Sequence, residues 1–117
     1  MVDARGKRIY LACGATDMRK AINGLSSIVS VRWKLDAFER ALFVFCNRNR
    51  DRLKILEWDG DGFWLYAKRL EKGRFQWPTR ADTPTLSLSE EEFGHLLGDT
   101  KLRRKFRRDE IAPGAVT

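Results

Sequence analysis

The sequence predicts an α+β fold: a mostly antiparallel sheet of about four or five strands, with one long amphipathic helix on a face and a short C-terminal helix. Three observations predict it. The length of 117 residues suits a single domain. Apolar runs separated by glycine- and aspartate-containing turns follow one another between residues 41 and 77, and apolar residues recur at steps of three and four between residues 17 and 33. A helix packed on a twisted sheet buries both apolar surfaces.

The N-terminal part predicts one strand followed by the long helix. Residues 7–14 (KRIYLACG) form an apolar run that ends at a glycine, which is typical of a buried strand. An apolar stripe then predicts a helix over 17–33, with Thr16 or Asp17 as its N-cap. The stripe consists of Met18, Ala21, Ile22, Leu25, Ile28, Val29 and Trp33.

The middle of the chain predicts an antiparallel meander. Residues 41–46 (ALFVFC) are apolar throughout, which indicates a strand covered on both faces. A polar loop over 47–52 precedes a strand over 53–58, and the turn 59–62 (DGDG) leads to a strand over 63–70. After a second turn at 71–73, we expect a fourth strand over 74–77, ended by Pro78.

The C-terminal part predicts a short helix and a basic tail. Ser89 is placed as an N-cap, Glu92 completes a capping box, and Gly98 ends the helix. We therefore assign residues 1–100 to one domain and residues 101–117 to a flexible tail, in which six of the eight residues 101–108 (KLRRKFRR) are basic.

Composition excludes several classes of protein. No apolar run approaches the length of about 18 residues that a membrane span needs, and the first residues lack a secretory signal, so we expect a cytoplasmic protein without membrane contact. His95 is the only histidine, which leaves too few residues for a His-based zinc site or a Ser-His-Asp triad. The sequence leaves the oligomeric state open.

The charge distribution favours a polyanionic partner. The formal net charge is +7, and the basic residues are gathered in blocks rather than mixed with the acidic ones. Arginine predominates among them, and its planar guanidinium pairs bidentately with phosphate. Nucleic acid is therefore the first partner to consider.

The stretch from 48 to 77 carries the predicted nucleic-acid contacts. Basic residues recur at a step of two in one part and alternate with aromatic residues in the next. The aromatic residues Phe63, Trp64, Tyr66, Phe75 and Trp77 are interpreted either as stacking platforms or as core. The predicted contacts are Arg48, Arg50, Arg52, Lys54, Lys68, Arg69, Lys72 and Arg74, together with Arg103 and Arg104 of the tail. DNA or RNA, single or double strand, and base specificity all stay open.

Two smaller groups have alternative interpretations. Glu57, Asp59 and Asp61 could hold a divalent cation, as in a metal-dependent nuclease, but turn chemistry alone explains the two aspartates, and we predict no cofactor and no metal. Residues Thr16, Asp17, Arg19 and Lys20 could bind an anion at a helix start, although the Asp17 carboxylate opposes this and ordinary capping is the favoured explanation.

Several motifs resemble one known family. They are TDMRK at 16–20, LFVF at 42–45, RLKIL at 52–56, WDGDGFW at 58–64, KRLEKGRF at 68–75 and WP at 77–78. In this order they closely resemble the accessory protein encoded by the second reading frame of bacterial insertion sequences of the 66 family, often labelled TnpB and distinct from the RNA-guided nuclease of that label. The resemblance covers residues 9 to 98.

The resemblance implies a small non-catalytic protein that assists DNA transposition beside a separate transposase. It carries no catalytic motif to transfer to this chain. The expected partners are therefore DNA and the element's transposase. An alternative is an adaptor that docks the transposase through the acidic helix at 89–97 and the hairpin aromatics without binding DNA.

Overall fold

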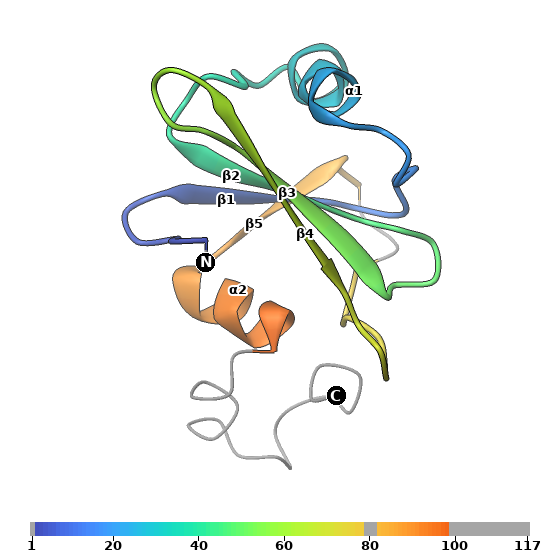
Figure 1. Ribbon diagram of the computed structural model, residues 1–117. Helices are drawn as coiled ribbons and strands as arrows, with labels where there is room; N and C mark the ends of the chain where they lie inside the picture. The colour runs from blue at the N-terminus through green and yellow to red at the C-terminus, as the bar shows by residue number, and fades with distance from the viewer. Residues whose placement is uncertain (1, 79–81, 99–117) are drawn as a thin grey trace.

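The computed structural model describes residues 2–78 and 82–98, which form a five-stranded sheet and two helical segments (Figure 1). In chain order the elements are β1 (Arg8–Ala12), α1 (Ile22–Ser27) continuing into a π-helical turn η1 (Ile28–Arg32), β2 (Ala41–Cys46), β3 (Arg52–Trp58), β4 (Phe63–Arg69), β5 (Thr85–Leu88) and α2 (Glu90–Leu97). No helix among these residues is long and apolar enough to span a membrane.

The sheet is mixed, with the strand order β4-β3-β2-β1-β5. β1 pairs with β2 in parallel, Ile9 opposite Leu42, while the other three pairings are antiparallel. The predicted fold class is wrong on two grounds: the sheet is mixed, because β1 and β2 are parallel, and the described residues contain two short helical segments in place of the long amphipathic helix. The crossover from β1 through the helical segment returns the chain to the end of the sheet where it started, and such a connection makes the two strands parallel.

Two apolar clusters lie on opposite faces of the sheet. α1 lies over one face and α2 over the other, as Figure 1 shows. Leu25 and Val29 of the α1–η1 segment pack on Phe43 and Phe45, and Phe93 of α2 belongs to the cluster on the other face. All six residues of β2 are buried, because β2 lies inside the sheet and both of its faces are covered.

The predicted long helix over 17–33 is wrong, because the helical segment begins only at Ile22. Residues before it form a turn in which the Lys20 amide donates to the Asp17 carbonyl over 3.2 Å. The Lys54 ammonium group donates to the carbonyls of Met18 (2.7 Å) and Lys20 (3.0 Å). These carbonyls are held by a side chain of β3, so a tertiary contact replaces the first turn that the apolar period predicts.

The predicted fourth strand over 74–77 is also wrong. Phe75 and Trp77 alternate into the core as strand residues would, but they form no ladder with a neighbouring strand. The Trp77 indole instead donates to the Ala12 carbonyl over 2.8 Å. The fifth strand is β5, which sequence reasoning missed because it is only four residues long, TLSL, and is followed at once by the N-cap of α2.

The other predicted elements are confirmed. The strands expected at 41–46, 53–58 and 63–70 correspond to β2, β3 and β4. α2 begins with the predicted capping box between Ser89 and Glu92, and it ends at Gly98, whose φ of 77° places it in the left-handed region. The basic tail predicted for 101–117 lies outside the described residues.

Candidate nucleic-acid interface

The loop between β2 and β3 is organised by the side chain of Asn47. Its Oδ1 accepts hydrogen bonds from the amides of Asp51 (3.1 Å) and Arg52 (3.0 Å), and its Nδ2 donates to the Asp51 carboxylate over 2.7 Å. Arg50 takes a positive φ of 61° within this loop. An asparagine side chain can hydrogen-bond to backbone amides nearby in sequence. Asn47 therefore closes the loop and fixes the backbone positions of the arginines that the loop carries.

A second segment, residues 70–76, lies against this loop. The Leu70 amide donates to the Asp51 carbonyl and the Phe75 amide to the Arg50 carbonyl, both over 2.7 Å. The Phe75 side chain is buried in the core and so holds the segment against the domain. Between loop and segment lies a hollow of about 670 Å³, lined in part by Asn49, Arg50 and Arg74.

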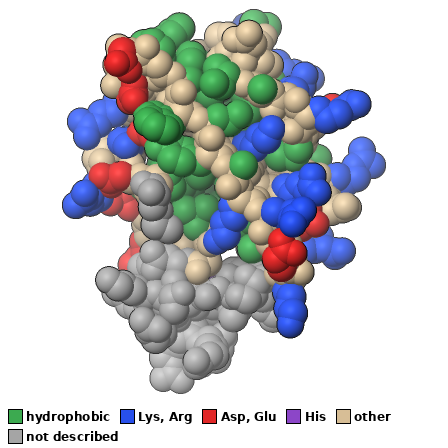
Figure 2. Space-filling view, in the orientation of Figure 1, with side chains coloured by type: hydrophobic (Ala, Val, Ile, Leu, Met, Phe, Trp, Pro, Cys, Tyr) green, Lys and Arg blue, Asp and Glu red, His purple; other side chains and the backbone are tan. Residues whose placement is uncertain are grey.

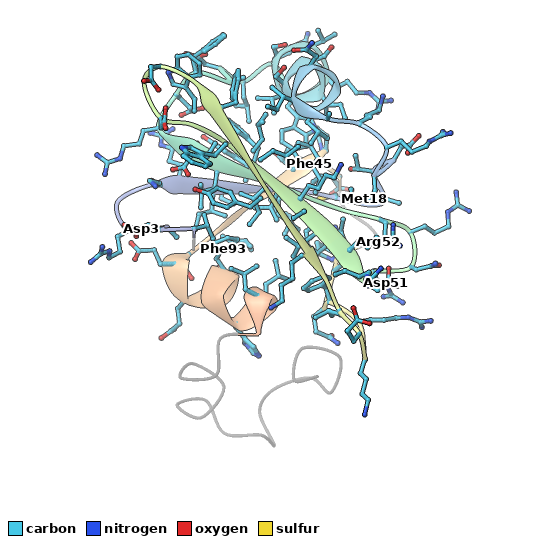
Figure 3. The ribbon with its side chains drawn as sticks, in the orientation of Figure 1. Asp3, Met18, Phe45, Asp51, Arg52 and Phe93 are labelled. Carbon is cyan, nitrogen blue, oxygen red and sulfur yellow. The ribbon has the colours of Figure 1, made fainter. Side chains whose placement is uncertain are left out.

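These contacts gather six basic residues at one end of the sheet. Arg52 lies opposite Arg69 in the register of β3 and β4, and the loop and the 70–76 segment contribute the others. In Figure 3 Arg52 and Asp51 are labelled at this end of β3, and Figure 2 shows blue side chains gathered on the same side. We call this surface the basic rim; it consists of Arg48, Arg50, Arg52, Arg69, Lys72 and Arg74.

Most of the positive charge of the basic rim is not neutralised internally. Arg69 forms an exposed ion pair with Glu71, at 3.0 Å between Nε and Oε2. The five other cations form no ion pair with any residue in the ranges 2–78 and 82–98. All rim residues except Arg50 are exposed, and Arg50 is half-buried. A surface of this kind attracts anions, and its arginines can bind phosphate with two parallel hydrogen bonds.

The remaining predicted contacts are placed differently. Lys54 is half-buried and donates to the two carbonyls of the 17–20 turn, and the Lys68 ammonium donates to the Leu97 carbonyl at the end of α2. Arg103 and Arg104 lie outside the described residues. The structure thus brings six of the eight predicted hairpin residues together, while two hold other elements against the sheet.

The hairpin aromatics divide between core and surface. Phe75 and Trp77 are buried, and Tyr66 packs partly against the same cluster. Trp64 is 56% exposed, but it lies near the β3–β4 turn, at the other end of β4 from the basic rim, where its indole donates to Asp59. The described structure therefore places no row of exposed rings beside the basic rim.

Of the three carboxylates considered for a metal site, Glu57 and Asp59 have hydrogen-bond donors within the chain. Glu57 is buried; it accepts hydrogen bonds from the Lys7 ammonium and from the Tyr66 hydroxyl, the latter over 2.8 Å. Asp59 accepts from the amides of Asp61 (3.3 Å) and Gly62 (3.2 Å), as a turn residue does. Within the described residues, no three His, Cys, Asp or Glu side chains are grouped to hold a metal ion.

The 16–20 motif forms a turn that lies before the helix. Asp17 accepts from the Arg19 amide (2.9 Å) and pairs with the Arg19 guanidinium (2.7 Å), which lowers the pKa of Asp17 to about 2. The Thr16 amide donates to the Cys46 carbonyl over 2.7 Å. Because α1 starts at Ile22, its free amides lie beyond this motif. Anion binding by Thr16, Asp17, Arg19 and Lys20 stays a prediction.

Sequence reasoning missed Asn47 as the residue that shapes the basic rim. The signal was an asparagine at the first position of a polar loop, where its side chain can hydrogen-bond to the loop backbone. We expect Asn47→Ala to lower the free energy of unfolding by about 1–3 kcal/mol, because it removes the three hydrogen bonds to Asp51 and Arg52 and leaves two loop amides without their acceptor. Urea unfolding followed by tryptophan fluorescence measures this difference. Asn49→Ala, which changes an exposed residue of the same loop, should stay within about 0.5 kcal/mol of the wild type. Equal effects for the two variants would contradict the role of Asn47.

Comparisons with known proteins identify the family of this chain. Residues 7–107 match the family model described as "IS66 Orf2 like protein". The chain is similar to two proteins of Sinorhizobium fredii (strain NBRC 101917 / NGR234), both named as uncharacterized. It is 37% identical to y4jC over 87% of this chain and 89% of that protein. It is 38% identical to y4hO over 77% of each. No solved structure matches this chain.

Proposed function

This chain belongs to the IS66 Orf2-like family, and from that premise we propose that it assists transposition by binding DNA through the basic rim. The family suggests an accessory role in the transposition of an insertion sequence. The proposal adds the ligand and the surface, and the role is one of binding rather than of chemical catalysis.

The observation that supports the proposal is the cluster of unpaired cations in the basic rim. Five of its six basic residues have no ion-pair partner in the described part of the chain. The loop that carries Arg48 and Arg50, and the start of β3 at Arg52, are held by the hydrogen bonds of Asn47. Arginines without an ion-pair partner bind phosphates without first losing one, and phosphate contacts supply a large share of the affinity for DNA.

A charge-matched pair of variants tests the proposal. The rim variant carries Arg48→Gln, Lys72→Gln and Arg74→Gln, three exposed residues of the basic rim. The control carries Arg32→Gln, Lys34→Gln and Arg40→Gln, three exposed residues that precede β2 and so lie towards the other end of the sheet. Both lose the same charge. We measure fluorescence anisotropy with labelled duplexes of the element terminus and of a scrambled sequence, and with the corresponding single strands.

We expect the rim variant to bind at least about tenfold more weakly than the control, and its salt dependence to become shallower by about 0.9 for each phosphate contact that is lost. Equal binding by the two variants would show that net charge alone attracts DNA, and it would overturn the assignment to the basic rim. No binding by the wild type at low salt would overturn the DNA-binding function itself.

A further inference from the structure

The turn between β3 and β4, at the end of the hairpin opposite the basic rim, gathers four aromatic side chains. Phe38 approaches Trp58 edge to face with 4.8 Å between ring centroids and lies 5.5 Å from Phe63, and Trp58 and Phe63 are 5.0 Å apart. Trp64 follows Phe63 on β4 and points to the other face of the sheet, since side chains alternate along a strand. We call Phe38, Trp58, Phe63 and Trp64 the aromatic tip.

Two rings of the aromatic tip are largely in contact with water. Phe38 is 60% exposed and Trp64 is 56% exposed, although both are held in place by neighbours. Phe38 packs on Trp58 and Phe63 and so extends an apolar cluster to the surface, and exposed apolar patches of this kind mark interaction surfaces. Aromatic residues are also the side chains that most often dominate the energy of protein interfaces.

Carboxylates surround the aromatic tip. Asp59 and Asp61 lie in the turn itself, and Asp36 caps the segment before Phe38 by accepting from the Phe38 amide over 2.9 Å. The pKa of Asp61 is raised because its carboxyl group shares a hydrogen bond with Asp59 and is repelled by it. None of these three aspartates forms an ion pair with a lysine or arginine of the described chain.

A groove continues from the aromatic tip towards the helix. It has a volume of about 380 Å³ and is lined by α1–η1 residues such as Ser26 and Ser30 and by Asp36 and Phe38 on its other side. The serine hydroxyls donate to helix carbonyls, as Ser30 does to Ser26 over 3.1 Å, so their oxygens can still accept a hydrogen bond. The groove therefore offers acceptors and one carboxylate beside an exposed ring.

We propose that the aromatic tip and this groove dock a basic segment of the element's transposase that carries a large apolar side chain. The apolar side chain packs against Phe38, and lysine or arginine side chains of the segment pair with Asp36, Asp59 and Asp61. The choice of partner follows from charge complementarity and from the family, which suggests association with the transposase. The proposal does not depend on DNA binding by the basic rim.

The two surfaces lie at opposite ends of the β3–β4 hairpin. Figure 2 shows red and green side chains together at the upper left, near the turn, and most of the blue side chains at the right, with others lower on the left. β4 runs from Phe63 in the aromatic tip to Arg69 in the basic rim, about 20 Å at the usual rise per strand residue. A peptide at the aromatic tip thus leaves the basic rim accessible.

Overlapping 15-residue peptides covering the transposase of the same element test the proposal. We measure their binding to the full chain by fluorescence anisotropy, without nucleic acid, and include a peptide of this chain's residues 99–117. For the tightest transposase peptide, Phe38→Ser and Asp61→Asn in the chain should each weaken binding about tenfold. Leu86→Ser, which changes an exposed leucine on the opposite edge strand β5, should change it less than about twofold.

Three outcomes would overturn the proposal: no transposase peptide binds, Leu86→Ser weakens binding as much as Phe38→Ser, or the peptide of residues 99–117 binds more tightly than every transposase peptide. Circular dichroism checks that each variant is folded. DNA binding measured on the same Phe38→Ser protein separates this proposal from the previous one, because Phe38 lies away from the basic rim and its loss should leave DNA affinity unchanged.

Discussion

Raising the salt concentration from 50 to 200 mM should weaken DNA binding by this chain about a thousandfold, if all six rim cations contact phosphates. Each contact releases condensed counterions, so six contacts give a slope of log affinity against log salt of about −5. The hydrogen bonds between the loop and the 70–76 segment bring Arg50 and Arg74 to one hollow, and Arg52 lies opposite Arg69 beside it, so the six cations share one end of the sheet and can contact phosphates together. Anisotropy titrations over a salt series measure the slope.

The rim variant provides the comparison for this slope. Removing three of the six cations should reduce the slope to roughly half, whereas the charge-matched control should keep the slope of the wild type. A wild-type slope between 0 and about −1 would mean that the DNA contacts are not made by the basic rim as a unit. Single- and double-stranded probes are compared at equal salt, because affinities at different salt concentrations are not comparable.

Lys7→Met should lower the free energy of unfolding by about 3–5 kcal/mol, a large share of the stability of a small domain. Lys7 pairs with Glu57, and the two side chains are only 15% and 7% exposed. The Tyr66 hydroxyl donates to the other carboxylate oxygen of Glu57. Without Lys7, Glu57 is left as a buried charge with one neutral donor. Urea unfolding followed by tryptophan fluorescence measures the loss.

Two further variants identify the cause of this loss. Lys20→Met removes an exposed lysine whose ammonium forms no ion pair in the described chain, and it should change stability by less than about 0.5 kcal/mol. The double variant Lys7→Met with Glu57→Gln should recover most of the lost stability, because it buries no charge and keeps an acceptor for Tyr66. A double variant as unstable as Lys7→Met alone would mean that packing of the lysine stem, rather than the charge, is what matters.

Local patterns predicted the elements whose stability is decided locally. The apolar run of β2, the DGDG turn and the Ser89 capping box each carry their structural cause within a few residues, and all three are found in the structure. The start of the helix was predicted wrongly because its cause lies far away in sequence: the Lys54 ammonium on β3 holds the carbonyls of Met18 and Lys20. The spacing of apolar residues between 17 and 33 cannot indicate this contact with Lys54.

In the candidate site, too, the local sequence predicted some features, whereas others depend on contacts with residues far away in sequence. Alternating basic residues identified the hairpin as the basic part of the chain, but spacing alone could not separate Lys54 and Lys68 from the others. Their partners are backbone carbonyls of a distant turn and of α2. The aromatic tip could not be predicted from the sequence either. Phe38 contacts Trp58 and Phe63 only because the connection before β2 folds over the end of the hairpin.

The parallel pairing of β1 with β2 implies an order of assembly for the sheet. β2, β3 and β4 are joined by short turns, so their pairings close small loops at little entropic cost and can form first. β1 can join only after the whole crossover to β2 has closed, and β5 pairs with β1 alone, Ile9 opposite Leu88. During synthesis on the ribosome, β1 is the first strand to be made, but it pairs with the edge strand β5 last. The slowest folding step should therefore be the closure of the β1–β5 edge, and a chain ending before residue 85 would leave β1 exposed as an unprotected edge strand.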